Sequence, residues 1–125
     1  MEPKEFENWL DEVNAKNERK PDFIATLKYL TYQQGGRRGP AYSGYRPGIE
    51  FPFDKMQTSG QQTFIGKDIV YPGDIADAEI IILSVDYFAG KLHEGMTFEF
   101  KEGPTLIGTG IIQKIINEKL KSNTL

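Results

Sequence analysis

The densest group of residues suited to ligand binding is a set of arginines in a glycine-rich stretch. Arg37, Arg38 and Arg46 are three of the four arginines in the chain and lie within ten residues of one another, close to Gly35, Gly36, Gly39, Tyr42 and Tyr45. Planar guanidinium groups beside aromatic rings on a glycine-rich loop favour contacts with phosphate or RNA. The alternative is a solvated loop whose arginines pair with nearby acids such as Glu50 or Asp54.

Two other motifs look functional but fit a structural role better. Residues Gly60 to Lys67 imitate a phosphate-binding loop, yet five residues separate the two glycines and Asp68 stands where a hydroxyl residue is needed to hold magnesium. Asp74, Asp77 and Glu79 form an acidic group, and a cation site would need such oxygens to converge from a rigid loop. We expect the acidic residues to solvate a turn and the start of a strand, and we expect no bound nucleotide.

The chain lacks the residues that most catalytic sites need. It has no cysteine, which excludes disulfides, thiolate zinc sites and a cysteine nucleophile. His93 is the only histidine, lies in a polar turn and has no serine or cysteine framework near it in the sequence. No two carboxylates stand out as an acid–base pair. We therefore expect a protein that is not an enzyme and that needs neither a cofactor nor a metal.

Length and charge narrow the class further. The 125 residues are enough for one domain with a real core. Fifteen basic and eighteen acidic residues give a net charge of −3, which excludes a generally basic surface for nucleic acid but not a local basic patch. The first residues are charged and no apolar run approaches the roughly 18 residues of a membrane span. We expect no signal peptide, no membrane span and a cytoplasmic location.

Residues 1–21 differ in pattern from the rest of the chain. Their apolar side chains follow the i, i+3, i+4, i+7 spacing of one helix face: Phe6, Trp9, Leu10 and Val13. Pro3 is tolerated in a first helical turn, and Pro21 ends the pattern. The spacing predicts a short amphipathic α-helix over 3–19.

From Asp22 onward the apolar pattern has the period of two that strands require. The expected strands cover 22–33, 49–54, 62–67, 78–86, 96–101 and 105–117, and they are separated by turns rich in glycine and proline. Gly108 and Gly110 lie two apart, as expected where a strand coils sharply or a neighbour approaches closely. The pattern predicts a closed antiparallel barrel or a sandwich over 22–117. We expect the polar tail 118–125 to fray.

The turn motifs, taken together, resemble the C-terminal β-barrel, or third domain, of bacterial elongation factor Tu. That family shows a GGRH-type turn and then GYRP, which match Gly35-Gly36-Arg37-Arg38 and Gly44-Tyr45-Arg46-Pro47. A later PGD turn and a closing EGM…EG…GxG segment match residues 72–74, 94–103 and 108–110. The resemblance covers about 22–117. It implies an all-β fold, a six-stranded antiparallel Greek-key barrel, here preceded by the short amphipathic helix.

The resemblance also implies a surface that binds a macromolecule. In the family the two positions after Gly-Gly contact tRNA, and Arg37 and Arg38 match them. The remaining matches are Tyr45, Arg46, Lys101, Glu102 and Gly103. Gly48 stands where the family usually has a tRNA-facing glutamine, Pro104 replaces a glycine, and a phosphate-facing lysine has no counterpart. The tRNA surface is therefore only partly kept.

The motifs of the family's GTPase domain do not occur in this sequence, so we expect a free-standing binding module of the translation apparatus. One reading is binding of aminoacyl-tRNA. The other is binding of a protein that normally recognises the factor, such as its nucleotide-exchange factor. A decoy or immunity-type protein, which imitates the factor to bind a toxin or a regulator, belongs to the second reading. The net charge of −3 and the eroded contacts favour a protein partner.

The N-terminal stripe generates the first prediction. In the family the barrel is flanked by two other domains, so a free-standing copy must cover apolar surface. We expect Phe6, Trp9, Leu10 and Val13 to dock on the barrel in cis, which contributes about 1.5–3 kcal/mol per side chain before entropy costs. Trp9 is the only tryptophan, so its emission should be blue-shifted and protected from quenchers in the dilute monomer. If the stripe instead serves a partner or a second copy, emission will be red-shifted and deletion of residues 1–20 will not lower stability.

Overall fold

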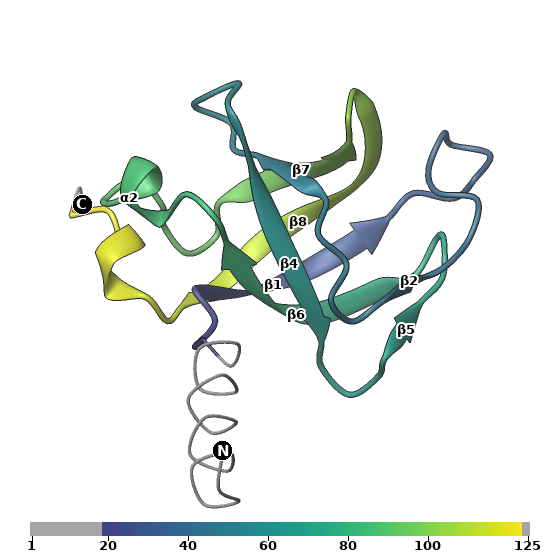
Figure 1. The fold of residues 1–125 in the computed structure, drawn as a ribbon, viewed down its shortest axis with the longest axis horizontal. Helices are drawn as coiled ribbons and strands as arrows, with labels where there is room; N and C mark the ends of the chain where they lie inside the picture. The colour runs from purple at the N-terminus through teal and green to yellow at the C-terminus, as the bar shows by residue number, and fades with distance from the viewer. Residues whose placement is uncertain (1–18, 124–125) are drawn as a thin grey trace, which may run out of the picture.

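The computed structural model describes residues 19–123, which fold as a closed six-stranded antiparallel β-barrel (Figure 1). Around the barrel the strands run in the order β1-β6-β4-β3-β7-β8, and pairing of β8 with β1 closes it. The six strands are β1 Phe23–Tyr29, β3 Gly48–Glu50, β4 Gln57–Phe64, β6 Ile75–Ile82, β7 Thr97–Glu102 and β8 Thr105–Ile115. The predicted all-β class and closed antiparallel barrel are confirmed.

Smaller elements decorate the two ends of the barrel. A two-stranded ribbon pairs β2, Ala41–Tyr42, with β5, Ile69–Val70. The short helix α2, Val85–Phe88, and the 3₁₀ turn η1, Glu118–Leu120, lie at the opposite end (Figure 1). No helix among residues 19–123 is long and apolar enough to cross a membrane. The helix predicted over 3–19, with its stripe of Phe6, Trp9, Leu10 and Val13, lies outside the described residues except for Arg19, which is not helical.

Strand β7 and its neighbour β8 follow the predicted alternation. Met96, Phe98 and Phe100 are buried, whereas the residues between them face outward. Gly110 and Gly108 lie directly opposite Phe98 and Phe100 on β8, and a Cβ atom on either glycine would overlap the facing ring. The glycines therefore make room for large aromatic side chains inside the barrel, as the spacing predicted.

The predicted strand over 49–54 is wrong beyond Glu50. Pro52 has no N–H to donate to a ladder, so β3 stops before it and the chain turns. Phe51 still packs in the core, but Phe53, which an uninterrupted period of two would place on the same face as Phe51, is exposed. On the other side of this turn β4 begins at Gln57, earlier than predicted, with Thr58 and Gly60 facing the core.

The tail from Glu118 does not fray over its described part, contrary to expectation. Leu120 is fully buried, and its carbonyl accepts a hydrogen bond of 2.9 Å from the N–H of Leu92. Asn117 caps the turn by accepting from the N–H of Lys119. Burial of the Leu120 side chain anchors this polar segment, because the backbone around Leu92 also forms hydrogen bonds with the backbone of the segment.

A buried carboxylate joins the start of β1, the end of β6 and the segment after β8. Asp22 is 1% exposed, and its two oxygens each accept a 2.8 Å hydrogen bond from Nη2 of Arg19. The same carboxylate accepts from the N–H of Ile82 at 2.8 Å and from Nδ2 of Asn117 at 2.9 Å. We call Arg19, Asp22 and Asn117 the Asp22 clamp.

Replacing the clamp carboxylate should cost much of the stability of the barrel. We expect Asp22→Ala to lower the free energy of unfolding by about 3 kcal/mol, because it leaves the buried N–H of Ile82 and the Asn117 amide without their acceptor and leaves Arg19 with only the carbonyl of Ile82. Asp77→Ala is the matched control: Asp77 is exposed and accepts one bond from Thr26, so the change should stay within about 0.5 kcal/mol. Urea unfolding measures both. Equal midpoints for the two variants would contradict the role assigned to the clamp.

Candidate functional site

Three of the predicted binding residues meet at one end of the barrel. Arg37, from the loop between β1 and β2, donates from Nη1 to Oε2 of Glu102, which lies 65 residues away at the end of β7. The Tyr45 hydroxyl donates to the same carboxylate oxygen, and the Arg37 guanidinium lies 4.7 Å from the centroid of the Tyr45 ring. We call Arg37, Tyr45 and Glu102 the arginine–glutamate network.

The backbone holds Arg37 in place as well. Its Nε donates to the carbonyl of Gly39 at 3.3 Å, and its Nη2 donates to the carbonyl of Pro40 at 3.2 Å. Burial alone lowers the pKa of Arg37, but the hydrogen bonds with Tyr45 and Glu102 outweigh burial and raise the pKa overall. Arg37 thus stays charged, and Glu102 compensates that charge inside the molecule.

Tyr29 and Gln62 form a polar pair inside the barrel, next to the arginine–glutamate network. Tyr29 packs beneath Tyr45 with 6.4 Å between ring centroids, and its hydroxyl donates to Oε1 of the buried Gln62. Nε2 of Gln62 has no hydrogen-bond partner within residues 19–123. Burial raises the pKa of Tyr29 and of Tyr45, and the hydrogen bond to Glu102 raises the pKa of Tyr45 further. Both phenols are therefore neutral and act as donors.

The other predicted residues divide between this end and elsewhere. Arg38 is exposed in the same loop, lies 5.4 Å from the Tyr32 ring centroid and donates to the Tyr32 hydroxyl at 3.2 Å. Gly103 forms the adjoining β7–β8 turn with a φ of +59°. Arg46 does not join them: it points outward over β4, beside Ser59 and Gln61.

Pairing of the arginines with Glu50 or Asp54, the alternative raised from the sequence, is wrong. Glu50 accepts from Nζ of Lys101 at 3.2 Å, and Lys101 also lies 3.7 Å from Glu99. Asp54 accepts from the Tyr87 hydroxyl, which lowers the pKa of that carboxyl. The acid that pairs with Arg37 is distant in sequence, so proximity along the chain could not identify it.

Exposed tyrosines lie at the same end of the barrel, and the predicted site residues include none of them, although the sequence placed Tyr42 near the arginines. Tyr32, Tyr42 and Tyr71 are 52%, 63% and 53% exposed. Tyr42 lies opposite Ile69 in the β2–β5 ribbon, and Tyr71 opens the turn that directly follows β5. Close approach of Thr31 to Gly73 brings Tyr32 and Arg38 to this end of the barrel. Tyr32 could have been found from the sequence, because the glycine-rich loop starts just after it.

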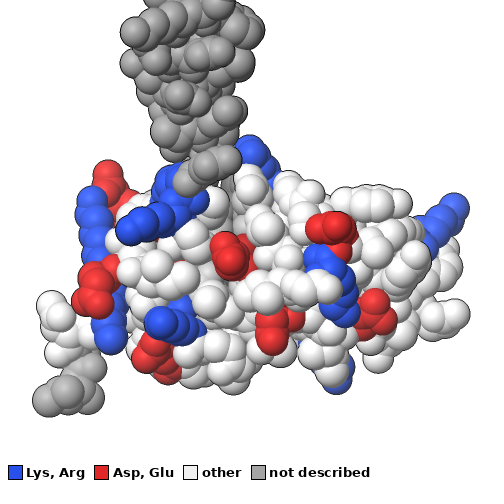
Figure 2. Space-filling model, turned by 90° about the horizontal axis from the view of Figure 1, so that it is seen from below, with Lys and Arg blue, Asp and Glu red and all other residues white. Residues whose placement is uncertain are grey.

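We call Tyr32, Arg38, Tyr42 and Tyr71 the tyrosine–arginine surface. Around it, residues 31–42, 67–74 and 101–103 carry four basic and three acidic side chains, and two of the basic ones, Arg37 and Lys101, are paired with carboxylates. Figure 2 shows the same mixture of signs on another face, with no broad area of one colour. The end of the barrel offers aromatic and hydrogen-bonding groups and little net charge.

Gly60, the first glycine of the segment that imitates a phosphate-binding loop, has a packing role. Gly60 lies within β4, and a Cβ atom there would overlap the Ile49 side chain. Within residues 19–123 no three acidic or histidine side chains gather as they would around a metal ion. No family model matches the chain.

The buried phenols give a pH prediction. Both tyrosines have an ordinary pKa of 10.0 when unfolded and a higher one in the barrel, so the unfolded chain releases these protons first. Stability is therefore full below pH 10 and falls as the pH rises above it. In an alkaline titration, phenolate absorbance from Tyr29 and Tyr45 should appear only with unfolding. Tyr45→Phe should shrink that step by one tyrosine, whereas Tyr42→Phe should not change it.

Proposed function

We propose that this chain is a non-enzymatic protein-binding module that resembles the third domain of elongation factor Tu. The turn motifs in the sequence support the resemblance, and so does the strand order. β3, β4 and β6 are consecutive neighbours, and β1 returns beside β6, which is the order of a Greek key. The module engages a protein that recognises elongation factor Tu: the nucleotide-exchange factor, or a toxin or regulator for which the module is a decoy or immunity-type protein.

The tyrosine–arginine surface is the observation that carries the proposal. Tyrosine and arginine are enriched where proteins bind proteins, and they supply most of the binding free energy there. Three exposed tyrosines and an exposed arginine at one end of a small barrel, with few unpaired charges around them, have that composition. Tyr42 lies in the paired ribbon, and Tyr32 and Tyr71 lie in turns whose backbones are closed by hydrogen bonds from Gly35 N–H to the Tyr32 carbonyl and from Asp74 N–H to the Tyr71 carbonyl. These bonds hold much of the surface in shape before a partner arrives.

A tRNA ligand fits this end less well. Affinity for a nucleic-acid backbone comes from basic side chains that neutralise phosphates. Arg37 already donates to Glu102 and to two carbonyls, Lys101 pairs with Glu50, and Arg46 points to a different face. Only Arg38, among the predicted contacts at this end, is exposed with no acidic partner within residues 19–123.

The test starts from affinity purification of the full chain from its native lysate, with bound proteins and RNA both identified. We expect a protein in stoichiometric amount without RNA, and excess elongation factor Tu should release it by competition. Titration calorimetry with that purified partner then tests the surface. Tyr42→Ala combined with Tyr71→Ala should weaken binding by about 2 kcal/mol, roughly 30-fold.

Tyr87→Ala is the matched control, because it removes an exposed tyrosine from α2 at the other end of the barrel (Figure 1). Equal losses from both changes would contradict the assigned surface. For tRNA we expect only non-specific affinity, with Kd values of about 1–100 μM. Tight tRNA binding would contradict the proposal. If the double variant Arg37→Ala, Arg38→Ala also reduced the slope of log affinity against log salt by about 1.5–2, tRNA would be the ligand of this loop.

A further inference from the structure

Two tyrosines of the tyrosine–arginine surface have side chains that the barrel itself does not use. Tyr42 and Tyr71 are 63% and 53% exposed, and their rings and hydroxyls have no ring, charge or hydrogen-bond partner within residues 19–123. Beside them, the Tyr32 hydroxyl accepts from Arg38. The surface therefore presents flat apolar rings together with hydrogen-bond donors that have no acceptor in the described part of the chain.

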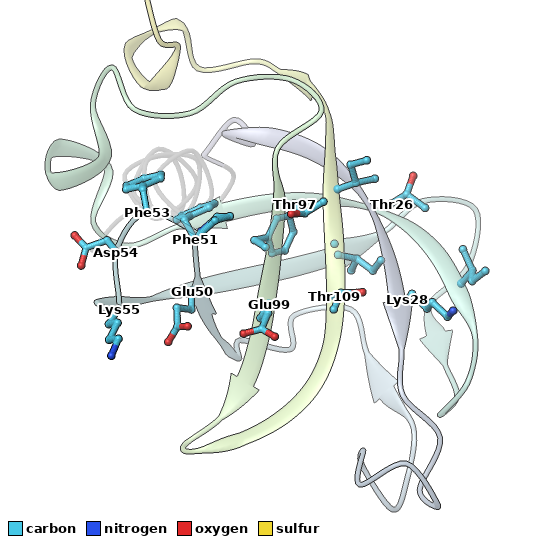
Figure 3. Close-up of a pocket in the computed structure, with 16 residues that line it drawn as sticks. Thr26, Lys28, Glu50, Phe51, Phe53, Asp54, Lys55, Thr97, Glu99 and Thr109 are labelled. Carbon is cyan, nitrogen blue, oxygen red and sulfur yellow. The ribbon is translucent and has the colours of Figure 1, made fainter.

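The structure around these tyrosines does not suit three common ways of binding a peptide segment. Strand addition needs an unpaired sheet edge, but the barrel is closed, and β2 and β5 have two residues each. An amphipathic helix needs an apolar groove, and the large groove over β1, β7 and β8 is not lined by any of the three tyrosines (Figure 3). A phosphorylated segment needs clustered arginines, but Arg37 is paired with Glu102.

We propose that the tyrosine–arginine surface binds a proline-rich segment of the partner in the polyproline II conformation. This inference rests on the proposed function and names the part of the partner that is recognised. A polyproline II helix has no internal hydrogen bonds, so its carbonyls can accept from tyrosine hydroxyls. Proline has no N–H that would need an acceptor on this donor-rich surface, and its ring packs on exposed aromatic side chains.

The spacing of the tyrosines suits such a helix. Across the ribbon Tyr42 lies about 5 Å from Ile69, and Tyr71 lies two residues, or about 6.6 Å, beyond Ile69 along extended backbone. The Cα atoms of Tyr42 and Tyr71 are therefore about 8 Å apart. A polyproline II helix repeats every three residues, or about 9 Å, so prolines three apart can each meet one tyrosine. The turn that begins at Tyr32 adjoins the turn that begins at Tyr71.

The charges at this end favour an acidic residue beside the prolines. Lys67 and Asp68 are adjacent, exposed and opposite in sign, and the Asp74 carboxylate accepts from the N–H of Tyr71 at 2.9 Å. Among the described residues around the surface, Arg38 is the charge left without a counterpart. The N–H groups of Arg38 that do not reach Tyr32 can bind a carboxylate of the partner segment.

Decaproline is the probe, and nuclear magnetic resonance of the full isotope-labelled chain is the measurement. We expect saturable shifts of the backbone signals around Tyr32, Tyr42 and Tyr71 and none around Tyr87, which is an exposed tyrosine at the other end of the barrel. A Gly-Ser peptide of the same length is flexible and has no rings, so it should cause no shifts. The absence of shifts with millimolar decaproline, or equal shifts with the Gly-Ser peptide, would overturn the inference.

Variants then test the contacts. Tyr42→Phe keeps the ring and removes the hydroxyl, so it should weaken decaproline binding about threefold to tenfold, and Tyr42→Ala should weaken it further. Tyr87→Phe is the matched control and should change nothing. Wild-type affinity in both Tyr42 variants would overturn the assigned contacts.

Peptides with one added glutamate test the role of Arg38. Decaproline extended by glutamate at one of its two ends should bind more tightly than decaproline, and Arg38→Gln should abolish that gain. No gain from either extension would contradict the acidic residue beside the prolines.

The peptide titration and the capture from lysate can fail separately. A captured protein that needs Tyr42 and Tyr71, together with no response to decaproline, would overturn this inference and leave the proposed function standing. Decaproline binding at the three tyrosines, together with a captured protein that excess elongation factor Tu does not release, would support this inference and contradict the proposed partner.

Discussion

The buried carboxylate of Asp22 is the interaction on which the arrangement of the barrel depends. A charge out of contact with water is tolerated only when hydrogen bonds surround it, and Asp22 receives them from Arg19, Ile82 and Asn117. These three come from the chain before β1, the end of β6 and the segment after β8. The clamp thereby fixes the seam where β8 meets β1 and orients the segments that leave it.

The barrel uses its arginines in two ways, which explains its mixed electrostatics. Arg37 is part of the structure: it spans the gap between a glycine-rich loop and the β7–β8 turn, and Glu102 neutralises it. Arg38, the next residue, faces solvent on the Tyr32 ring. The two adjacent side chains point in different directions here, so one arginine forms an internal ion pair and the other an exposed contact. A count of basic residues would overestimate the charge that this end offers to a ligand.

The sequence predicts the fold well where a strand alternates without interruption, as in β7, where Phe98 and Phe100 face Gly110 and Gly108. It fails where one residue overrides the local pattern: Pro52 ends β3, and Leu120 anchors a polar tail. For the site, resemblance named both Arg37 and Glu102, but their pairing across 65 residues depends on barrel closure and has no local signature. Tyr32 and Tyr71 were missed because aromatic residues near strands suggest core, whereas Tyr42 was noted beside the arginines.

Closure of the barrel by β1 and β8 also brings the two ends of its chain together. Phe23 pairs with Ile115, and the backbone N–H groups of Ile116 and Asn117 both donate to the carbonyl of Asp22. A domain whose entry and exit points are neighbours can be spliced into a surface loop of another protein without stretching its host. It can also be circularly permuted, with new termini in a turn such as 103–104 and with the original entry and exit points of the barrel joined by a linker. The barrel can therefore be moved between proteins as one folded unit.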